Sequence, residues 1–109
     1  MAPAFDVYLE ANKYQFLVGE QIELVIETER SGYLYVFDVD AEKKVTQLFP
    51  NQFEKENALA AGTQVKVPHP RARYQFTADK PYGTSTIVAL VTREKWDEHT
   101  RLDLPATLS

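Results

Sequence analysis

The sequence predicts an all-β protein, specifically an immunoglobulin-like β-sandwich of about seven antiparallel strands. Apolar and polar residues alternate along most of the chain, as they do in strands that bury one face. Gly and Pro residues separate the alternating runs at short intervals, which is typical of turns between strands. The 109 residues are 44% hydrophobic and fit one domain spanning residues 1–109.

The first alternating runs are AFDVYLEA and QIELVIETE. Their predicted apolar faces consist of Phe5, Val7 and Leu9 in the first run and Ile22, Leu24 and Ile26 in the second. The next two runs, GYLYVFDVD and VTQLFP, are joined by the charged AEKK and predict a hairpin. Further strands are expected at residues 64–67, 74–77 and 84–92.

Two segments predict helical structure instead. EKENALAAG, inside the connection 51–62, predicts a short helical turn with Asn57 as its cap and Gly62 at its end. The tail from residue 94 lacks the strand alternation, and its spacing allows a second short helix that Pro105 would end.

The runs YLYVFDV and TIVALVT are apolar in both phases of the alternation. A strand that is apolar on both faces is usually covered on both. The opposite sheet provides one cover, so the other must be the long loop, the tail or a partner molecule.

Composition excludes several classes of function. The net charge is −4 and no basic stripe is present, which argues against nucleic-acid binding. Cys is absent, so disulfides, thiolate metal sites and Cys nucleophiles are excluded. No apolar run is long enough for membrane insertion and no signal peptide is visible. The compartment stays undetermined: cytoplasmic for the sequence as written, periplasmic or secreted for a domain cut from an exported chain.

The LFPN segment is the most prominent candidate motif, and its turn chemistry favours a structural role. Pro50 would end a strand, Asn51 would bond nearby backbone, and Leu48 or Phe49 would plug one end of the sandwich. DVDAE resembles the start of a calcium loop, but Lys43 and Phe49 stand where that loop needs Gly and Glu.

The remaining catalytic and metal signals are weak. Two isolated His residues do not make a zinc site, and no Ser lies in a Gly-x-Ser-x-Gly elbow. We therefore expect neither an enzyme nor a bound metal or cofactor.

Several blocks occur in the order of a known family: Tyr14 with GE at 19–20, GYLYVFDVD, VTQLFPN, AGTQVKVP, and a Gly followed by ALVT. Over about residues 5–93 the chain resembles the bacterial domain-of-unknown-function family 4384, with residues 94–109 as a tail. AEKK departs from the pattern because a Gly before the Lys would be usual. The resemblance implies a non-catalytic β-sandwich accessory module, often appended to kinase-like, caspase-like, envelope or secretion-associated proteins. It carries over no functional residues.

The leading hypothesis is a non-enzymatic adaptor of a bacterial envelope, secretion or signalling system that binds another protein. The interaction candidates are Tyr33, Tyr35, Phe37, Phe49, Asn51, Phe53 and Trp96. Trp96 serves equally well as an interface anchor or as a cover for the open sheet face. The alternative is a domain that binds a small ligand or cell-wall component in a pocket under the 50–62 loop, lined by Phe53, Tyr74 and Tyr82. Homo-oligomerisation through a sheet edge such as residues 5–10 is also open.

Overall fold

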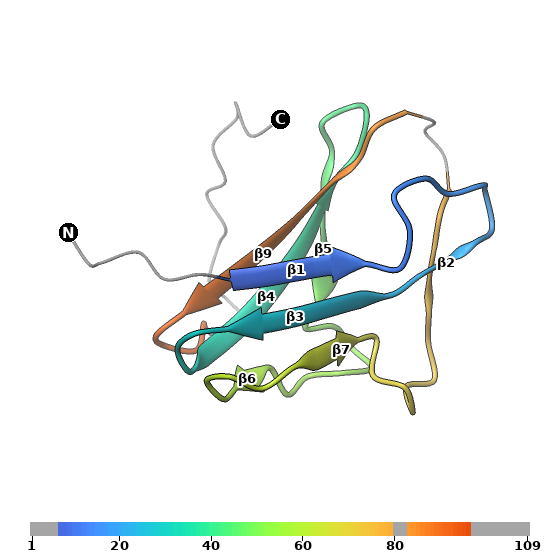
Figure 1. The fold of residues 1–109 in the computed structure, drawn as a ribbon. Helices are drawn as coiled ribbons and strands as arrows, with labels where there is room; N and C mark the ends of the chain where they lie inside the picture. The colour runs from blue at the N-terminus through green and yellow to red at the C-terminus, as the bar shows by residue number, and fades with distance from the viewer. Residues whose placement is uncertain (1–6, 80–82, 97–109) are drawn as a thin grey trace.

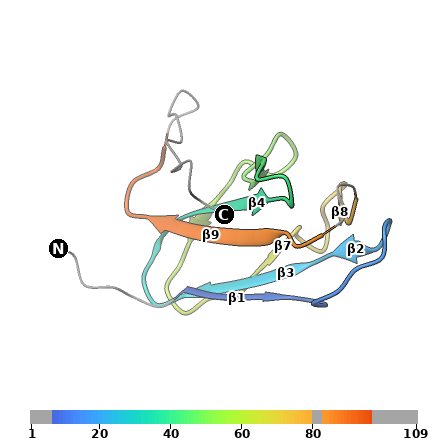
Figure 2. The same cartoon turned by 90° about the horizontal axis from the view of Figure 1, so that it is seen from above.

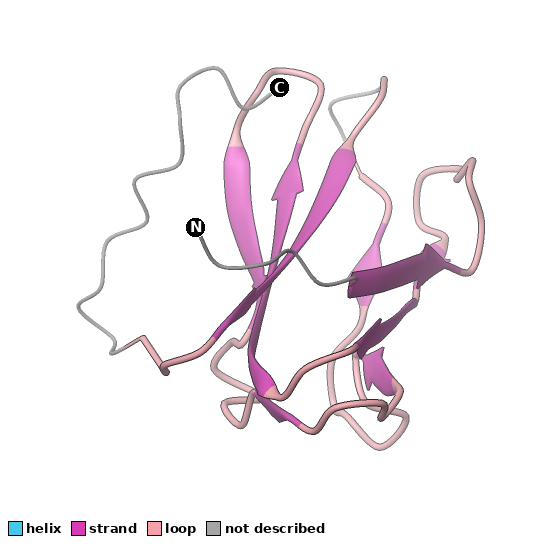
Figure 3. Cartoon of the chain, turned by 60° about the vertical axis from the view of Figure 1, so that its left-hand side comes forward, coloured by secondary structure: helices cyan, strands magenta, loops and turns pink. Residues whose placement is uncertain are grey.

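The computed structural model describes residues 7–79 and 83–96, and it confirms the all-β class: these ranges contain strands and loops but no helix (Figures 1 and 3). The strands form antiparallel sheets in a sandwich-like arrangement (Figure 1). Their bounds are β1 Val7–Ala11, β2 Gln21–Ile22, β3 Leu24–Thr28, β4 Gly32–Val39, β5 Val45–Phe49, β6 Ala58–Leu59, β7 Val65–Val67, β8 Phe76–Thr77 and β9 Thr86–Thr92.

Two sheets form the layers of the sandwich. One has the order β1-β3-β7, and the other is built around β4, which pairs with β5, β6 and β9. Seen from above, β9 and β4 lie in one layer and β1 and β3 in the other (Figure 2). The short β2–β8 pair is a separate two-stranded sheet by its hydrogen bonding, although β2 leads directly into β3.

The core between the layers follows the predicted alternation. It consists of Leu24, Ile26, Leu34, Val36, Phe49, Leu59 and Val67, with flanking apolar side chains from β1 and β9 packed against them. In β3, for example, alternate residues are fully buried while Val25 and Glu27 between them stay partly exposed. The predicted strand at 21–29 is divided at Glu23, whose backbone N–H is bonded to the side chain of Asn12 at 3.0 Å.

The predicted helical turn in the connection 51–62 is wrong. This segment runs extended to β6, which pairs with Gly32 and Tyr33 of β4. Asn57 is not a helix cap: its backbone O accepts from Leu34 N–H at 2.9 Å and its side-chain amide donates to Leu34 O at 3.0 Å. Hydrogen bonding to the N–H and C=O groups at the edge of β4 therefore stabilises the extended form of this segment more than local helix propensity stabilises a helical turn. The second predicted helix falls mostly at residues 97–109, outside the described ranges.

The predicted charged hairpin turn joins β4 to β5. Asp40 organises it by accepting backbone N–H bonds from Glu42 at 2.8 Å and Lys44 at 2.9 Å through one carboxylate oxygen. Lys43 has φ of 69°, a left-handed conformation that favours Gly. In the part of the chain that the structure describes, no helix is long and apolar enough to cross a bilayer.

The first prediction concerns Gly32, at the start of β4. A Cβ atom at this position would lie 2.5 Å from the backbone O of Thr92 and 2.8 Å from Val91 Cγ1. We expect Gly32→Ala to lower the free energy of unfolding by about 1–3 kcal/mol, because β4 and β9 must separate to admit the methyl group. Urea denaturation measures this. Ser31→Ala, at the exposed neighbouring position, is the control, and equal stability of the two variants would contradict the prediction.

The second prediction concerns the hairpin turn. Lys43→Gly removes the side-chain penalty of the left-handed conformation, so we expect it to raise the free energy of unfolding by about 0.5–1 kcal/mol. Lys44→Gly is the matched control, because Lys44 is not among the residues with positive φ. There the added chain entropy should destabilise the fold by about 0.5–1 kcal/mol. Thermal unfolding of both variants would reveal the opposite signs, and a shift in the same direction would refute the account.

Candidate functional site

The outer face of the β4 sheet is the side opposite the core, and it carries the aromatic residues predicted as interaction candidates. Tyr33, Tyr35 and Phe37 alternate along β4 with the core residues, and the register pairs Tyr35 with Leu90 and Phe37 with Val88 of β9. The relative exposure of Tyr35 is only 4% and that of Phe37 is 1%, while Tyr33 is half-buried. Tyr35 and Phe37 are therefore not displayed as an accessible aromatic patch.

Trp96 covers part of this outer face. Its ring stacks on Tyr35 with the centroids 4.2 Å apart and the planes inclined by 26°. Its backbone N–H also donates to the Tyr35 hydroxyl at 2.7 Å. The sequence left three possible covers for this face: the long loop, the tail or a partner. The start of the tail, at Trp96, covers Tyr35.

Phe49 and Asn51 have the structural roles that turn chemistry predicts. Phe49 ends β5 with its side chain in the core, and Pro50 follows it. The Asn51 carboxamide oxygen accepts from the backbone N–H groups of Phe53 at 2.8 Å and Glu54 at 2.9 Å. Its amide nitrogen donates to Leu48 O at 2.9 Å. These contacts make Asn51 a corner residue of the turn that follows β5.

Phe53 is the predicted loop candidate that remains exposed. It stacks on Tyr74 with ring centroids 5.5 Å apart, and Tyr74 meets Phe76 edge-on at 5.4 Å. Tyr82, the third residue of the predicted pocket, lies outside the described ranges. The pairing of Phe53 with Tyr74 is therefore present, but as an aromatic stack on the surface.

Glu54 holds the 68–75 connection against this stack. One of its carboxylate oxygens accepts from the Tyr74 hydroxyl at 2.6 Å and from His69 N–H at 3.0 Å. Partial burial and the adjacent Glu54 carboxylate raise the pKa of Tyr74 to about 12. The phenol therefore stays protonated and continues to donate at neutral pH.

The acidic residues near the hairpin are engaged in structural contacts. Partial burial, together with the nearby Asp40 carboxylate, raises the pKa of Asp38, and a hydrogen bond with Ser85 partly offsets the effect. Asp40 caps the turn as described above. Within residues 7–79 and 83–96, His, Asp and Glu side chains form no group of three that could hold a metal ion.

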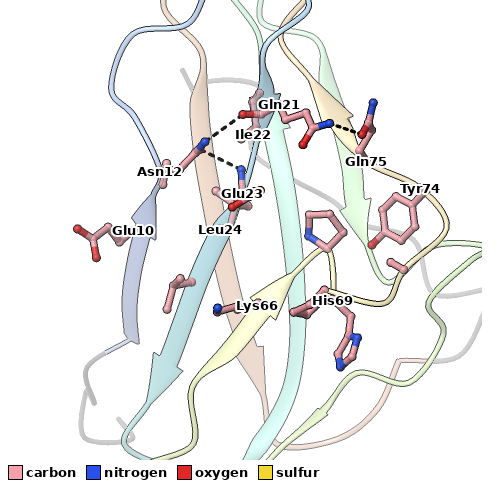
Figure 4. A pocket seen from close by; sticks show the side chains of 15 residues that line it. Glu10, Asn12, Gln21, Ile22, Glu23, Leu24, Lys66, His69, Tyr74 and Gln75 are labelled. Atoms are coloured by element: carbon pink, nitrogen blue, oxygen red, sulfur yellow. Dashed lines mark hydrogen bonds between the residues drawn. The ribbon is translucent and has the colours of Figure 1, made fainter.

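A groove of about 610 Å³ lies along β1, β3 and β7 and under the 68–75 connection (Figure 4). Its lining is mixed: carboxylates, amides and a cation stand beside short apolar side chains and Tyr74. At one end Gln21 donates to Gln75 at 2.5 Å. This groove includes Tyr74 but no residue of the 50–62 loop, under which a pocket was expected.

Among residues 7–79 and 83–96, the two most exposed large apolar side chains, Tyr14 and Leu17, belong to the connection between β1 and β2. We name this connection, residues 12–20, the Tyr14 loop. The relative exposure is 97% for Tyr14, 76% for Leu17 and 53% for Val18. Sequence reasoning missed this surface because it treated these residues as a spacer between strands. The available signal was the apolar run YQFLV, which has no alternation and sits where a polar turn would be usual.

The base of the Tyr14 loop is held in place by Glu20. Its carboxylate pairs with Lys13 and accepts from Leu17 N–H at 2.7 Å, and these contacts lower the pKa of Glu20. Two backbone bonds tie the loop to Ala78: Gly19 N–H to Ala78 O at 2.8 Å and Ala78 N–H to Glu20 O at 2.9 Å. The apolar tip is therefore presented from a defined base.

The comparisons with known proteins give one match. The family model described as "Domain of unknown function (DUF4384)" matches residues 15–95, which is most of the chain. Neither the curated proteins nor the solved structures yield a match. The matched region starts within the Tyr14 loop and ends beside Trp96, so it includes both sheets except β1. The resemblance seen in the sequence is thereby confirmed, and the chain belongs to the DUF4384 family.

Proposed function

We propose that this domain is a non-catalytic interaction module that binds another protein through the Tyr14 loop. The observation that carries the proposal is the high exposure of Tyr14 and Leu17 on a loop whose base is fixed by Glu20. Exposed apolar groups gathered in one place mark contact surfaces more often than chance. Functional groups are also commonly carried on loops that a rigid scaffold positions.

The energetics of such a contact favour this loop over the outer sheet face. Covering a large apolar side chain contributes about 1.5–3 kcal/mol, and the Tyr14 loop offers several that the domain itself leaves in water. The contacts of Glu20 reduce the ordering entropy that binding would otherwise cost. Tyr35 and Phe37, by contrast, have little surface left to bury.

A role as an adaptor agrees with what is expected of the family. Its members are expected to be accessory modules attached to envelope, secretion or signalling proteins, and such a module needs a surface for a second protein. Binding through a loop at one end of the sandwich would leave both sheets intact.

The third prediction tests this loop. A Tyr14→Ser/Leu17→Ser variant should fold normally, because both side chains are exposed. Its affinity for a protein partner should fall about 100-fold, which corresponds to the loss of about 3 kcal/mol of apolar burial. The partner is identified by a photo-crosslinking amino acid placed at Tyr14, and its affinity is then measured by calorimetry with both purified proteins.

The control for this experiment is Val45 on β5, an exposed apolar residue outside the loop. A photo-crosslinker at Val45 should not capture the same partner, and Val45→Ser should bind it normally. Equal affinity of the double variant and the wild type would overturn the assignment to the Tyr14 loop.

A second candidate function rests on the groove of Figure 4. Its volume of about 610 Å³ falls in the range of small-molecule sites. The carboxylate and amide groups along it can donate to and accept from hydroxyl groups, and Tyr74 adds an aromatic edge. These features support a neutral, hydroxyl-rich ligand such as a cell-wall saccharide.

The fourth prediction tests that ligand class. Soluble peptidoglycan fragments at 100 times their Kd should raise the free energy of unfolding by about 2.7 kcal/mol, seen as a higher Tm. Gln75→Ala should reduce the shift because Gln75 lines the groove, whereas Gln52→Ala, an exposed residue outside it, should not. An unchanged Tm for the wild type would remove this candidate.

A further inference from the structure

Strand β9 is an edge strand that is well suited to receive another strand. It pairs with β4 over seven consecutive residues, from Tyr33 opposite Thr92 to Val39 opposite Thr86, without a break in register. Among residues 7–79 and 83–96, β9 has no second strand partner. Because backbone groups alternate in direction along a strand, about half of those in β9 point away from β4.

The usual protection of an edge strand is missing from β9. Proteins guard their edges with charged side chains, Pro residues or bulges. The edge strand β1 contains Glu10, and β5 carries an extra residue at Leu48, where its register with β4 shifts. β9, with the sequence TIVALVT, has no charge, Pro or Gly and no bulge.

The side chains of β9 are also less buried than those of its neighbour. Ile87, Ala89 and Val91 face the core but are only half-buried. Opposite them on β4, Leu34 and Val36 are fully buried, while Asp38, the register partner of Ile87, is half-buried. On the outer face, Leu90 keeps a relative exposure of 37%. An added strand would bury apolar surface on both faces of β9.

The sequence of β9 is nearly the same when read backwards. If a second copy pairs antiparallel with Ala89 opposite the partner's Ala89, Val88 meets the partner's Leu90, Ile87 meets the partner's Val91, and Thr86 meets the partner's Thr92. Every cross-strand pair then joins Thr with Thr or one apolar side chain with another, and no pair places like charges together. A two-fold axis requires this self-complementarity of an isologous contact.

We propose that β9 is a self-association site, through which two copies of the chain pair antiparallel about Ala89 and join their β4 sheets into one. This differs from the expected self-pairing at residues 5–10, because Glu10 makes β1 the poorer edge. It also goes beyond the proposed partner binding, because it uses no residue of the Tyr14 loop. A single pair of strands buries less surface than a standard interface, so the dimer is weak and depends on concentration.

Sedimentation equilibrium tests this, with the protein at about 1 μM to about 1 mM, a range that spans weak association. The wild type should shift from monomer to dimer. Leu90→Lys should weaken the dimer at least tenfold, because it replaces an apolar pair and sets the two introduced ammonium groups diagonally across the interface. Val45→Lys is the matched control, since the relative exposure is 38% at Val45 and 37% at Leu90.

A second measurement fixes the register and does not depend on the folding of the Leu90→Lys variant. The chain contains no Cys, so single Cys residues can be introduced cleanly. Mixing Val88→Cys with Leu90→Cys should give the mixed disulfide several-fold faster than either variant forms its own, because only positions 88 and 90 lie directly opposite.

The proposal is overturned by any of three results. These are a wild type that stays monomeric over the whole range, a dimer that Leu90→Lys and Val45→Lys weaken equally, and disulfides that form without preference for the 88–90 pair.

Discussion

Strand β4 imposes the main constraint on this fold, because its backbone is paired along both edges and its side chains are buried on both faces. β9 pairs with one edge from Tyr33 to Val39, whereas β5 and β6 share the other. Leu34 and Val36 face the core, and Tyr35 and Phe37 are equally buried on the outer side. Every segment that contacts β4 therefore has to supply either backbone hydrogen bonds or an apolar cover.

That constraint explains why irregular segments of the chain behave as they do. The connection 51–62 extends along β4 because Leu34 needs hydrogen-bond partners there, and Asn57 provides them. The chain that follows β9 lies against the outer face at Trp96, where the ring and the backbone N–H of that residue both contact Tyr35. The Tyr14 loop and the edge of β9 that has no strand partner among the described residues are not needed to cover β4.

Much of the fold could be predicted from sequence because alternation with a period of two reports burial directly. It gave the faces of β1, β3 and β4 correctly, and the LFPN segment behaves as its turn chemistry indicates. The site was harder to predict. Apolar residues in both phases of β4 do not reveal whether the second face contacts the same chain or a partner. In the structure the chain itself buries Tyr35 and Phe37, so these two side chains offer little accessible surface. The exposed surface of the Tyr14 loop was not predicted, because alternation identifies strands and gives no information about an apolar run between them.

The contact between Trp96 and Tyr35 has an optical consequence. Trp96 is the only tryptophan of the chain, so all indole fluorescence originates at the point where the chain leaves β9 and rests on the outer face. Emission from an indole stacked on a phenol and partly shielded from water differs in wavelength and intensity from that of an indole in solvent. The native protein thus carries a built-in reporter at the margin of this sheet, and its signal follows the attachment of the chain there without any label.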